Sequence, residues 1–260
     1  MSVPESGPAE SGGIEDSLEQ GLFSHLLELR SRLLKALTTV VLVLLALVPF
    51  ANRLYAELAA PLVARLPQGA HLIATEVTSP FITPLKLALY AALFISMPVI
   101  LYQLWAFVSP GLYRHEKRLA RPLLVAAMGL FYLGCAFAYF LVLPAAFRFL
   151  TAVTPQGVEM MTDISHYLDF VMLMFFAFGL CFEVPVAVVI LAAIGVVDVA
   201  KLRSGRRYAI VGAFAIAALI TPPDITSMMM LGIPMCLLYE LGVLAVRWLV
   251  KPGALSPDAG

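Results

Sequence analysis

The sequence has few charged residues, and this shortage narrows the function classes. Only 13% of its 260 residues are charged and 61% are hydrophobic, whereas a soluble domain has about twice that charged share. The mean hydropathy of +0.93 is too high for a surface that faces water. The composition therefore excludes a soluble enzyme, a nucleic-acid-binding protein and a disordered chain. The charges of seventeen basic and seventeen acidic residues cancel, so the net charge gives no information about binding partners.

Cysteine is also scarce, and the three cysteines are not spaced as metal ligands or as a disulfide framework would be. Cys135, Cys181 and Cys236 lie inside apolar runs, where a thiol behaves as a small hydrophobic side chain. No CxxC or Cys/His spacing occurs, so we predict neither a metal site nor a disulfide framework. A glycine-rich nucleotide-binding loop is missing as well, and we expect no cofactor.

The first residues lack the features of a cleavable secretory signal. Residues 1–22 are acidic and rich in small residues, without a basic segment followed by an apolar one. We predict a disordered tail over 1–21, one membrane domain over 22–250 and a C-terminal tail over 251–260. The sequence shows no internal repeat and no inverted pair of broken spans of the kind found in many transporters.

Long apolar runs predict an all-α polytopic membrane protein, because about 20 apolar residues are needed to cross a bilayer. The fourth run needs tilt or a kink, which Pro185 can supply. The fifth run is short and is followed by a Thr-Pro-Pro-Asp turn. We favour two short spans there over a re-entrant hairpin. The six predicted spans are 33–50, 85–108, 122–143, 168–197, 208–220 and 228–246.

The basic residues predict the orientation of these spans. Thirteen of the seventeen lie before or in the first turn of the first span, between spans two and three, between spans four and five, or after the sixth. Short loops rich in Lys and Arg stay in the cytoplasm, so we predict that both termini are cytoplasmic. The two outward segments, 51–84 and 144–167, are rich in proline and are expected to form short helical caps.

Two carboxylates on the basic side are candidates for function. Residues 22–36 form an amphipathic helix suited to the membrane interface. Within it, Glu28 stands four residues before Arg32, the spacing of a simple helical ion pair. Glu116 lies among four cations and could serve only to reduce their repulsion. The residues alone leave these structural roles open.

A third carboxylate lies deep in a predicted span. Glu183 is fifteen positions into the fourth span, where a charge is costly and usually functional. It suggests an alternative function, a proton-coupled secondary transporter with Glu183 as carrier. Asp224 could cap the sixth span. A membrane-embedded hydrolase is disfavoured, because the spans contain no paired Asp, HExxH or Ser/His set.

Six motifs occur in an order that resembles the TatC family, the receptor subunit of twin-arginine protein translocases. The resemblance covers about residues 22–250. The motifs are HLLELR (25–30), SPF (79–81), PVILYQLWAF (98–107), PGLYRHEKR (110–118), FGLCFEVPV (178–186) and LITPPD (219–224).

The resemblance implies a concave, glove-like protein of six transmembrane helices that is not an enzyme. In the family, two cytoplasmic glutamates bind the paired arginines of a signal peptide, and these positions match Glu28 and Glu116. The match is chemically reasonable, because guanidinium pairs bidentately with carboxylate and lysine does not. Arg30 and Arg32 match basic positions near that surface.

The resemblance also implies partners. Glu183 matches an intramembrane glutamate that engages the single-span subunits TatA and TatB, and the region of Thr221 and Asp224 matches a docking site for a partner helix. Met228 stands where the family often has Gln. The implied setting is the bacterial inner membrane, where the proton-motive force drives export of folded proteins carrying twin-arginine signal peptides. Self-association within the receptor complex is also implied, and no nucleic acid is expected.

Overall fold

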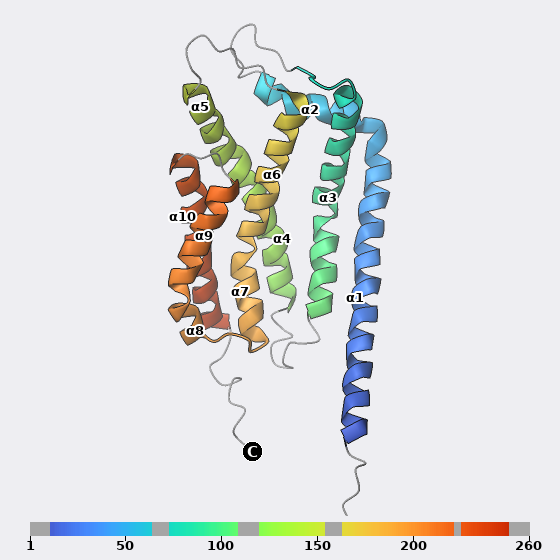
Figure 1. Cartoon of the computed structure of the whole chain (residues 1–260), viewed down its shortest axis with the longest axis vertical. Helices are drawn as coiled ribbons and strands as arrows, with labels where there is room; N and C mark the ends of the chain where they lie inside the picture. The colour runs from blue at the N-terminus through green and yellow to red at the C-terminus, as the bar shows by residue number, and fades with distance from the viewer. Residues whose placement is uncertain (1–10, 64–72, 109–119, 154–162, 221–224, 250–260) are drawn as a thin grey trace, which may run out of the picture.

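The computed structural model describes residues 11–63, 73–108, 120–153, 163–220 and 225–249. Those residues are helical apart from short turns and one isolated bridge between Ile73 and Asp163. The helices stand roughly upright in one bundle (Figure 1). The prediction of an all-α protein is therefore confirmed, as expected where apolar segments must satisfy their own backbone hydrogen bonds.

Helix α1 is the longest helix and forms one edge of the bundle. It spans Ser11–Leu47 and continues through a 3-10 turn, Val48–Phe50, into α2, Ala51–Val63. Figure 1 shows α1 running the height of the bundle and α2 crossing its upper end. Helix α1 begins inside the segment predicted as a tail up to residue 21, because Glu, Leu and Gln there favour continued helix.

Helix α3, Ser79–Val108, lies beside α1 and begins earlier than the span predicted from residue 85. Pro84 and Pro98 both lie inside this helix. Proline is tolerated in the first turn of a helix and, where neighbouring helices satisfy the backbone, inside membrane helices. The second span, predicted from residue 85, therefore begins six residues earlier, at Ser79.

The third and fourth spans are each built from more than one helical piece. Helix α4, Ala120–Phe137, continues through a π-helical segment, Ala138–Val142, into α5, Leu143–Val153. Helix α6, Ile164–Phe182, is followed by α7, Val184–Ala193. The predicted interruption near Pro185 is confirmed, and the break falls at Glu183 with Pro185 in the first turn of α7.

Three helices complete the bundle. They are α8, Val199–Ser204, α9, Arg206–Ile220, and α10, Ile225–Leu249. Within the described ranges, five helical segments are long and apolar enough to cross a membrane. Helix α9 corresponds to the fifth predicted span, and its 15 residues give only about 22 Å of helix. It packs against α10.

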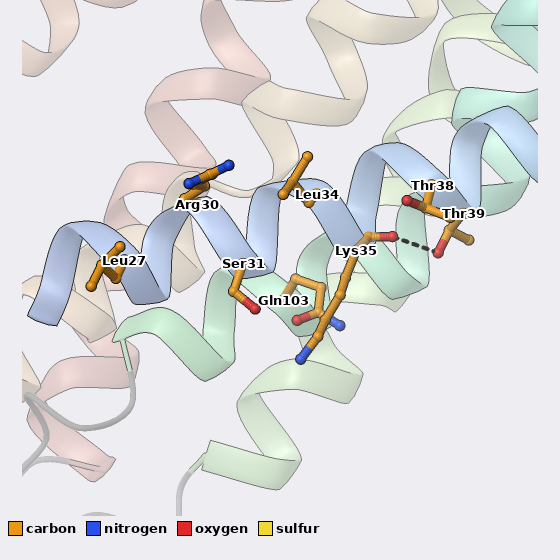
Figure 2. Close-up of a pocket in the computed structure, with 8 residues that line it drawn as sticks. All are labelled: Leu27, Arg30, Ser31, Leu34, Lys35, Thr38, Thr39 and Gln103. Carbon is orange, nitrogen blue, oxygen red and sulfur yellow. Dashed lines mark hydrogen bonds between the residues drawn. The ribbon is translucent and has the colours of Figure 1, made fainter.

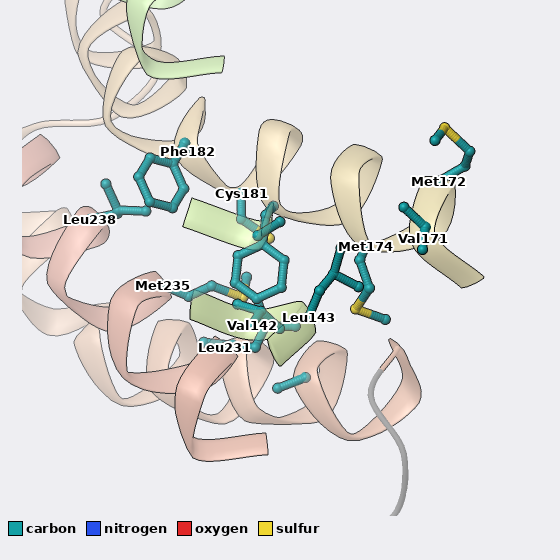
Figure 3. Close-up of a cluster of buried hydrophobic side chains, with 14 of the residues drawn as sticks. Val142, Leu143, Val171, Met172, Met174, Cys181, Phe182, Leu231, Met235 and Leu238 are labelled. Carbon is teal, nitrogen blue, oxygen red and sulfur yellow. The ribbon is translucent and has the colours of Figure 1, made fainter. Parts of the chain in front are cut away.

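The apolar core is centred on α6. Phe178 and Leu168 are fully buried. Figure 3 shows Phe182 of α6 near Leu238 of α10, and Val142 of the π-helical segment near Met235 of α10. Helices α4 and α6 approach closely at Gly134, where a Cβ would lie 2.5 Å from the carbonyl oxygen of Phe178. Only glycine allows this contact, so α6 is fixed tightly by its neighbours.

Candidate functional site

One end of the bundle gathers most of the basic residues that the structure describes. It includes the N-terminal half of α1, the starts of α4 and α9, helix α8 and the end of α10, all at the lower end of Figure 1. The clustering agrees with the charge pattern of the sequence. The described basic residues of this end are Arg30, Arg32, Lys35, Arg121, Lys201, Arg203, Arg206, Arg207 and Arg247.

Glu28 and Arg32 form an ion pair at this end, on one face of α1. The Arg32 Nε donates to Oε1 of Glu28 at 3.0 Å and Nη2 donates to the same oxygen at 2.5 Å. The side chain of Glu28 is 37% exposed and that of Arg32 is 23% exposed. Both donors use Oε1, and within the described residues no donor reaches Oε2. The carboxylate is therefore held in place but open to a second cation.

A groove of about 620 Å³ runs along the adjacent face of the same helix (Figure 2). Arg30 belongs to the groove, whereas Arg32 faces Glu28, because residues two apart lie on different sides of a helix. The Thr39 hydroxyl donates to the Lys35 carbonyl at 2.9 Å. The residues that line the groove are Leu27, Arg30, Ser31, Leu34, Lys35, Thr38 and Thr39 of α1 and Gln103 of α3.

Glu183 occupies the break between α6 and α7. Its backbone N–H bonds to the carbonyl of Leu180 at 3.1 Å, and its carbonyl accepts from Ala187 at 2.9 Å, so the main chain is satisfied. The side chain is half-buried, and its Oε1 is buried with no hydrogen-bond partner in the described part of the chain. An unpartnered carboxyl oxygen buried within a membrane span is costly.

A polar clasp, which the sequence did not reveal, joins the other end of α6 to the segment before α3. Asp163 accepts bonds from the backbone and hydroxyl of Thr75 at 2.9 and 2.7 Å, and from the backbone of Ser165 and His166 at 2.8 and 3.1 Å. The Thr75 hydroxyl, followed by backbone donors, holds the pKa of Asp163 well below its usual range. An Asp before a helix is a recognisable cap, but Thr75 is 88 residues away.

Three predicted site residues, Glu116, Thr221 and Asp224, lie outside the described residues. Met228, where the family often has Gln, is partly buried against the α6 core. Among the residues that the structure describes, no group of three or more His, Cys, Asp or Glu side chains is placed to hold a metal ion.

A protein-family model described as "Sec-independent protein translocase protein (TatC)" matches residues 24–234. The chain belongs to the TatC family. The resemblance seen in the six motifs is thus confirmed, and the chain is a multi-pass membrane protein that functions in Sec-independent protein translocation. Members of the TatC family are components of a protein translocase and are not known enzymes. Because the relatives act in protein translocation, the proton-coupled transporter considered as an alternative is not retained.

Similar proteins cover nearly the whole chain. The TatC protein of Azotobacter chroococcum mcd 1 is 55% identical over 222 residues, which are 85% of this chain and 87% of that relative. The TatC protein of Escherichia coli (strain K12) is 52% identical over 240 residues, or 92% of each chain.

Two solved TatC structures share the fold. One, described as the crystal structure of the twin-arginine translocase receptor TatC, matches with a TM-score of 0.74 and 36% identity over 87% of this chain and 100% of that one. The second, described as the same receptor in DDM, gives a TM-score of 0.75 and 37% identity over 85% and 98% of the two chains.

Proposed function

We propose that this chain is the receptor that binds twin-arginine signal peptides, with Glu28 and Glu116 each holding one guanidinium. The observation that carries the proposal is the state of Glu28. Its carboxylate is more than a third exposed at the basic end of the bundle, and Arg32 occupies only Oε1. Arg32 thereby fixes the carboxylate while leaving an acceptor for an arriving arginine.

Recognition then depends on geometry as well as charge. A guanidinium offers parallel N–H donors that match a carboxylate, and an ammonium is a point charge without that fork. Two carboxylates can therefore distinguish an Arg-Arg pair from Lys-Lys. Arg32 sets the position of Glu28 through its two hydrogen bonds, and Arg30, on the adjacent face of α1, completes the basic surface that the peptide meets.

The setting we propose is the bacterial cytoplasmic membrane with the basic end, and both termini, in the cytoplasm. The support is the gathering of basic residues at one end of the bundle and the rule that such segments remain inside. The proton-motive force would then drive export of the folded substrate.

Glu183, Thr221 and Asp224 are proposed to engage the single-span partners TatA and TatB. The support is the buried, unpartnered Oε1 of Glu183, which a polar group from another helix would satisfy. Self-association of the receptor belongs to the same proposal.

Peptide binding to the purified full-length protein tests the proposal. A fluorescent Arg-Arg signal peptide should bind tightly and its Lys-Lys counterpart at least tenfold more weakly, a difference of ~1.4 kcal/mol. Glu28→Gln should remove most of that preference, because the amide keeps the shape but loses the charge.

Glu57→Gln is the matched control. Glu57 forms the same kind of i,i+4 pair, accepting from Arg53 at 3.2 Å, but on α2 at the opposite end of the bundle. It should bind both peptides as the wild type does. Equal binding of Arg-Arg and Lys-Lys peptides by the wild type would contradict the proposal.

A further inference from the structure

Helix α3 contains a proline that leaves one backbone carbonyl without its usual donor. Pro98 lies ten residues before the end of the helix at Val108. Proline has no backbone N–H, so the carbonyl of Phe94, four residues earlier, loses the hydrogen bond that a regular helix gives it. Within a membrane span no water replaces that donor, and an unsatisfied carbonyl is costly there. A donor from outside α3 is therefore needed.

Tyr132 of α4 supplies this donor. Its hydroxyl donates to the carbonyl oxygen of Phe94 at 2.8 Å, across 38 positions of the chain. The Tyr132 ring meets the fully buried Phe131 edge to face, with ring centroids 5.6 Å apart. The Phe94 ring stacks on Phe176 of α6 with centroids 4.8 Å apart. Donor and acceptor are thus held in place by aromatic contacts among three helices.

The exposure of Tyr132 shows that packing of its ring does not explain a tyrosine at this position. Tyr132 is 42% exposed on the outer surface of α4, where Val125 and Leu133 are 69% and 56% exposed. An apolar side chain would cover that surface equally well, and a phenol hydroxyl inside a membrane span needs a partner. What tyrosine adds to phenylalanine here is the hydrogen bond to the carbonyl that the proline frees.

Residues 99–108, which we call the inner half of α3, connect this hydrogen bond to the proposed peptide site. The inner half carries Gln103, which lines the groove on α1, the helix of Glu28. Its buried side chains share one apolar cluster with those of α4. In the sequence, Glu116 lies four residues before α4 begins. The angle of α3 at Pro98 therefore affects the separation of α1 from the start of α4, on which the spacing of the two carboxylates depends.

We propose that Tyr132 is a positioning residue for recognition of the signal peptide, a role that rests on the proposed function of Glu28 and Glu116. By holding the carbonyl that Pro98 leaves free, its hydroxyl fixes the angle between the inner half of α3 and the rest of that helix. Two adjacent guanidinium groups can each meet a carboxylate only if the carboxylates are correctly spaced. Loss of the hydroxyl lets the angle vary, which lowers the fraction of molecules in the binding-competent arrangement.

A double-mutant cycle tests the hydrogen bond. Tyr132→Phe keeps the ring but removes the donor, and it should lower the Tm of the full-length protein in detergent by a few degrees. Pro98→Ala restores a backbone N–H to the Phe94 carbonyl. In the Pro98→Ala background, Tyr132→Phe should therefore leave the Tm unchanged. An equal loss of Tm in both backgrounds would overturn the assignment.

Distances between spin labels test the positioning role in the absence of peptide. The three native cysteines are first replaced by alanine, and labels are then attached at exposed positions. One pair, Leu104 with Val125, reports on the inner half of α3 relative to α4, and a second pair, Leu89 with Phe140, reports on the other half. Tyr132→Phe should shift or broaden the distance of the first pair and leave the second unchanged. Equal changes in both pairs would show a general loosening and overturn the proposal.

Peptide binding links the angle of α3 to recognition. Tyr132→Phe should weaken binding of the fluorescent Arg-Arg peptide about five- to tenfold, and it should cause no further loss in the Pro98→Ala background. Tyr139→Phe is the matched control. Tyr139 is 39% exposed in the same span, its ring contacts Phe140 and Phe175, and among the described residues its hydroxyl has no hydrogen-bond partner. This variant should match the wild type in Tm and in affinity.

Wild-type affinity of the Tyr132→Phe protein for the Arg-Arg peptide would overturn the proposal, whether or not the label distances change. That result would leave intact the preference of the wild type for Arg-Arg over Lys-Lys. Equal binding of the two peptides by the wild type would instead refute the proposed function and, with it, the role of Tyr132 in recognition. The two failures are therefore distinguishable by the wild-type protein alone.

Discussion

Helix α1 and the α6–α7 pair have the same hydropathy and opposite surroundings. The most apolar window of each has a mean hydropathy of 2.4, yet 6% of the α1 window is buried inside the protein against 56% of the α6–α7 window. Lipid is as apolar as a protein core, so hydropathy cannot separate the two environments. Close packing depends instead on small residues such as Gly134 and Gly179, which let α4 and α6 touch.

The carboxylates of Glu28 and Glu183 therefore lie in different surroundings. Glu28 lies on a helix that contacts mainly α3, where water and a large ligand have access. Glu183 lies in the most buried of the described spans, and its Oε1 has no hydrogen-bond partner among the described residues. The first is suited to bind a charged peptide, and the second to meet a helix within the membrane.

Matched leucine truncations should give the largest difference between the two regions. Leu168 of α6 is fully buried and Leu42 of α1 is 62% exposed. We expect Leu168→Ala to lower the free energy of unfolding by about 2–5 kcal/mol through a lost contact and a cavity, and Leu42→Ala by less than ~0.5 kcal/mol. Thermal unfolding in one detergent measures both. Comparable losses would show that α1 is packed as tightly as α6.

Alanine substitutions at two glycines of α4 should also change the free energy of unfolding by different amounts. A Cβ at Gly134 would lie 2.5 Å from the Phe178 carbonyl oxygen, whereas a Cβ at Gly129 meets nothing within 4 Å. Gly134→Ala should therefore destabilise by about 1–3 kcal/mol through overpacking, and Gly129→Ala should be neutral or stabilising. The same unfolding assay decides, and a neutral Gly134→Ala would refute the close α4–α6 contact.

The Asp163 clasp should give a smaller effect that depends on pH. Its hydrogen bonds favour the carboxylate, so the folded pKa is lower than the usual value near 4. The stabilisation is therefore fully present above about pH 4 and is lost as the pH falls through the lower folded pKa. Asp163→Asn should lower the Tm by a few degrees at pH 7 and should narrow its gap to the wild type in acid. A gap that stays constant from pH 7 to well below pH 4, toward the lowered folded pKa, would contradict the assignment.

The sequence predicted the helical membrane architecture because apolar runs, prolines and basic clusters are local features. The break near Pro185 and the short α9 followed from such features. The starts of α1 and α3 did not, because Glu, Leu and Gln extended one helix and membrane packing tolerated Pro84 in the other. The sequence could predict that Glu28 was four residues from Arg32, but not that both donors would use one oxygen.

Long-range contacts were beyond local patterns. Asp163 meets Thr75 across 88 positions, and Gln103 joins Arg30 and Lys35 in one groove only because α3 lies beside α1. These contacts depend on how the helices are arranged, which periodicity and charge alone do not specify.

A double-mutant cycle tests whether Glu28 binds an arginine of the signal peptide. Affinity is measured for wild type and Glu28→Gln, each with the Arg-Arg peptide and with peptides in which one or the other arginine is lysine. We expect a coupling energy of at least ~1 kcal/mol between Glu28 and one arginine, because only that pair forms the guanidinium–carboxylate fork. Strictly additive losses for both arginines would contradict it and show that Glu28 does not bind the signal directly.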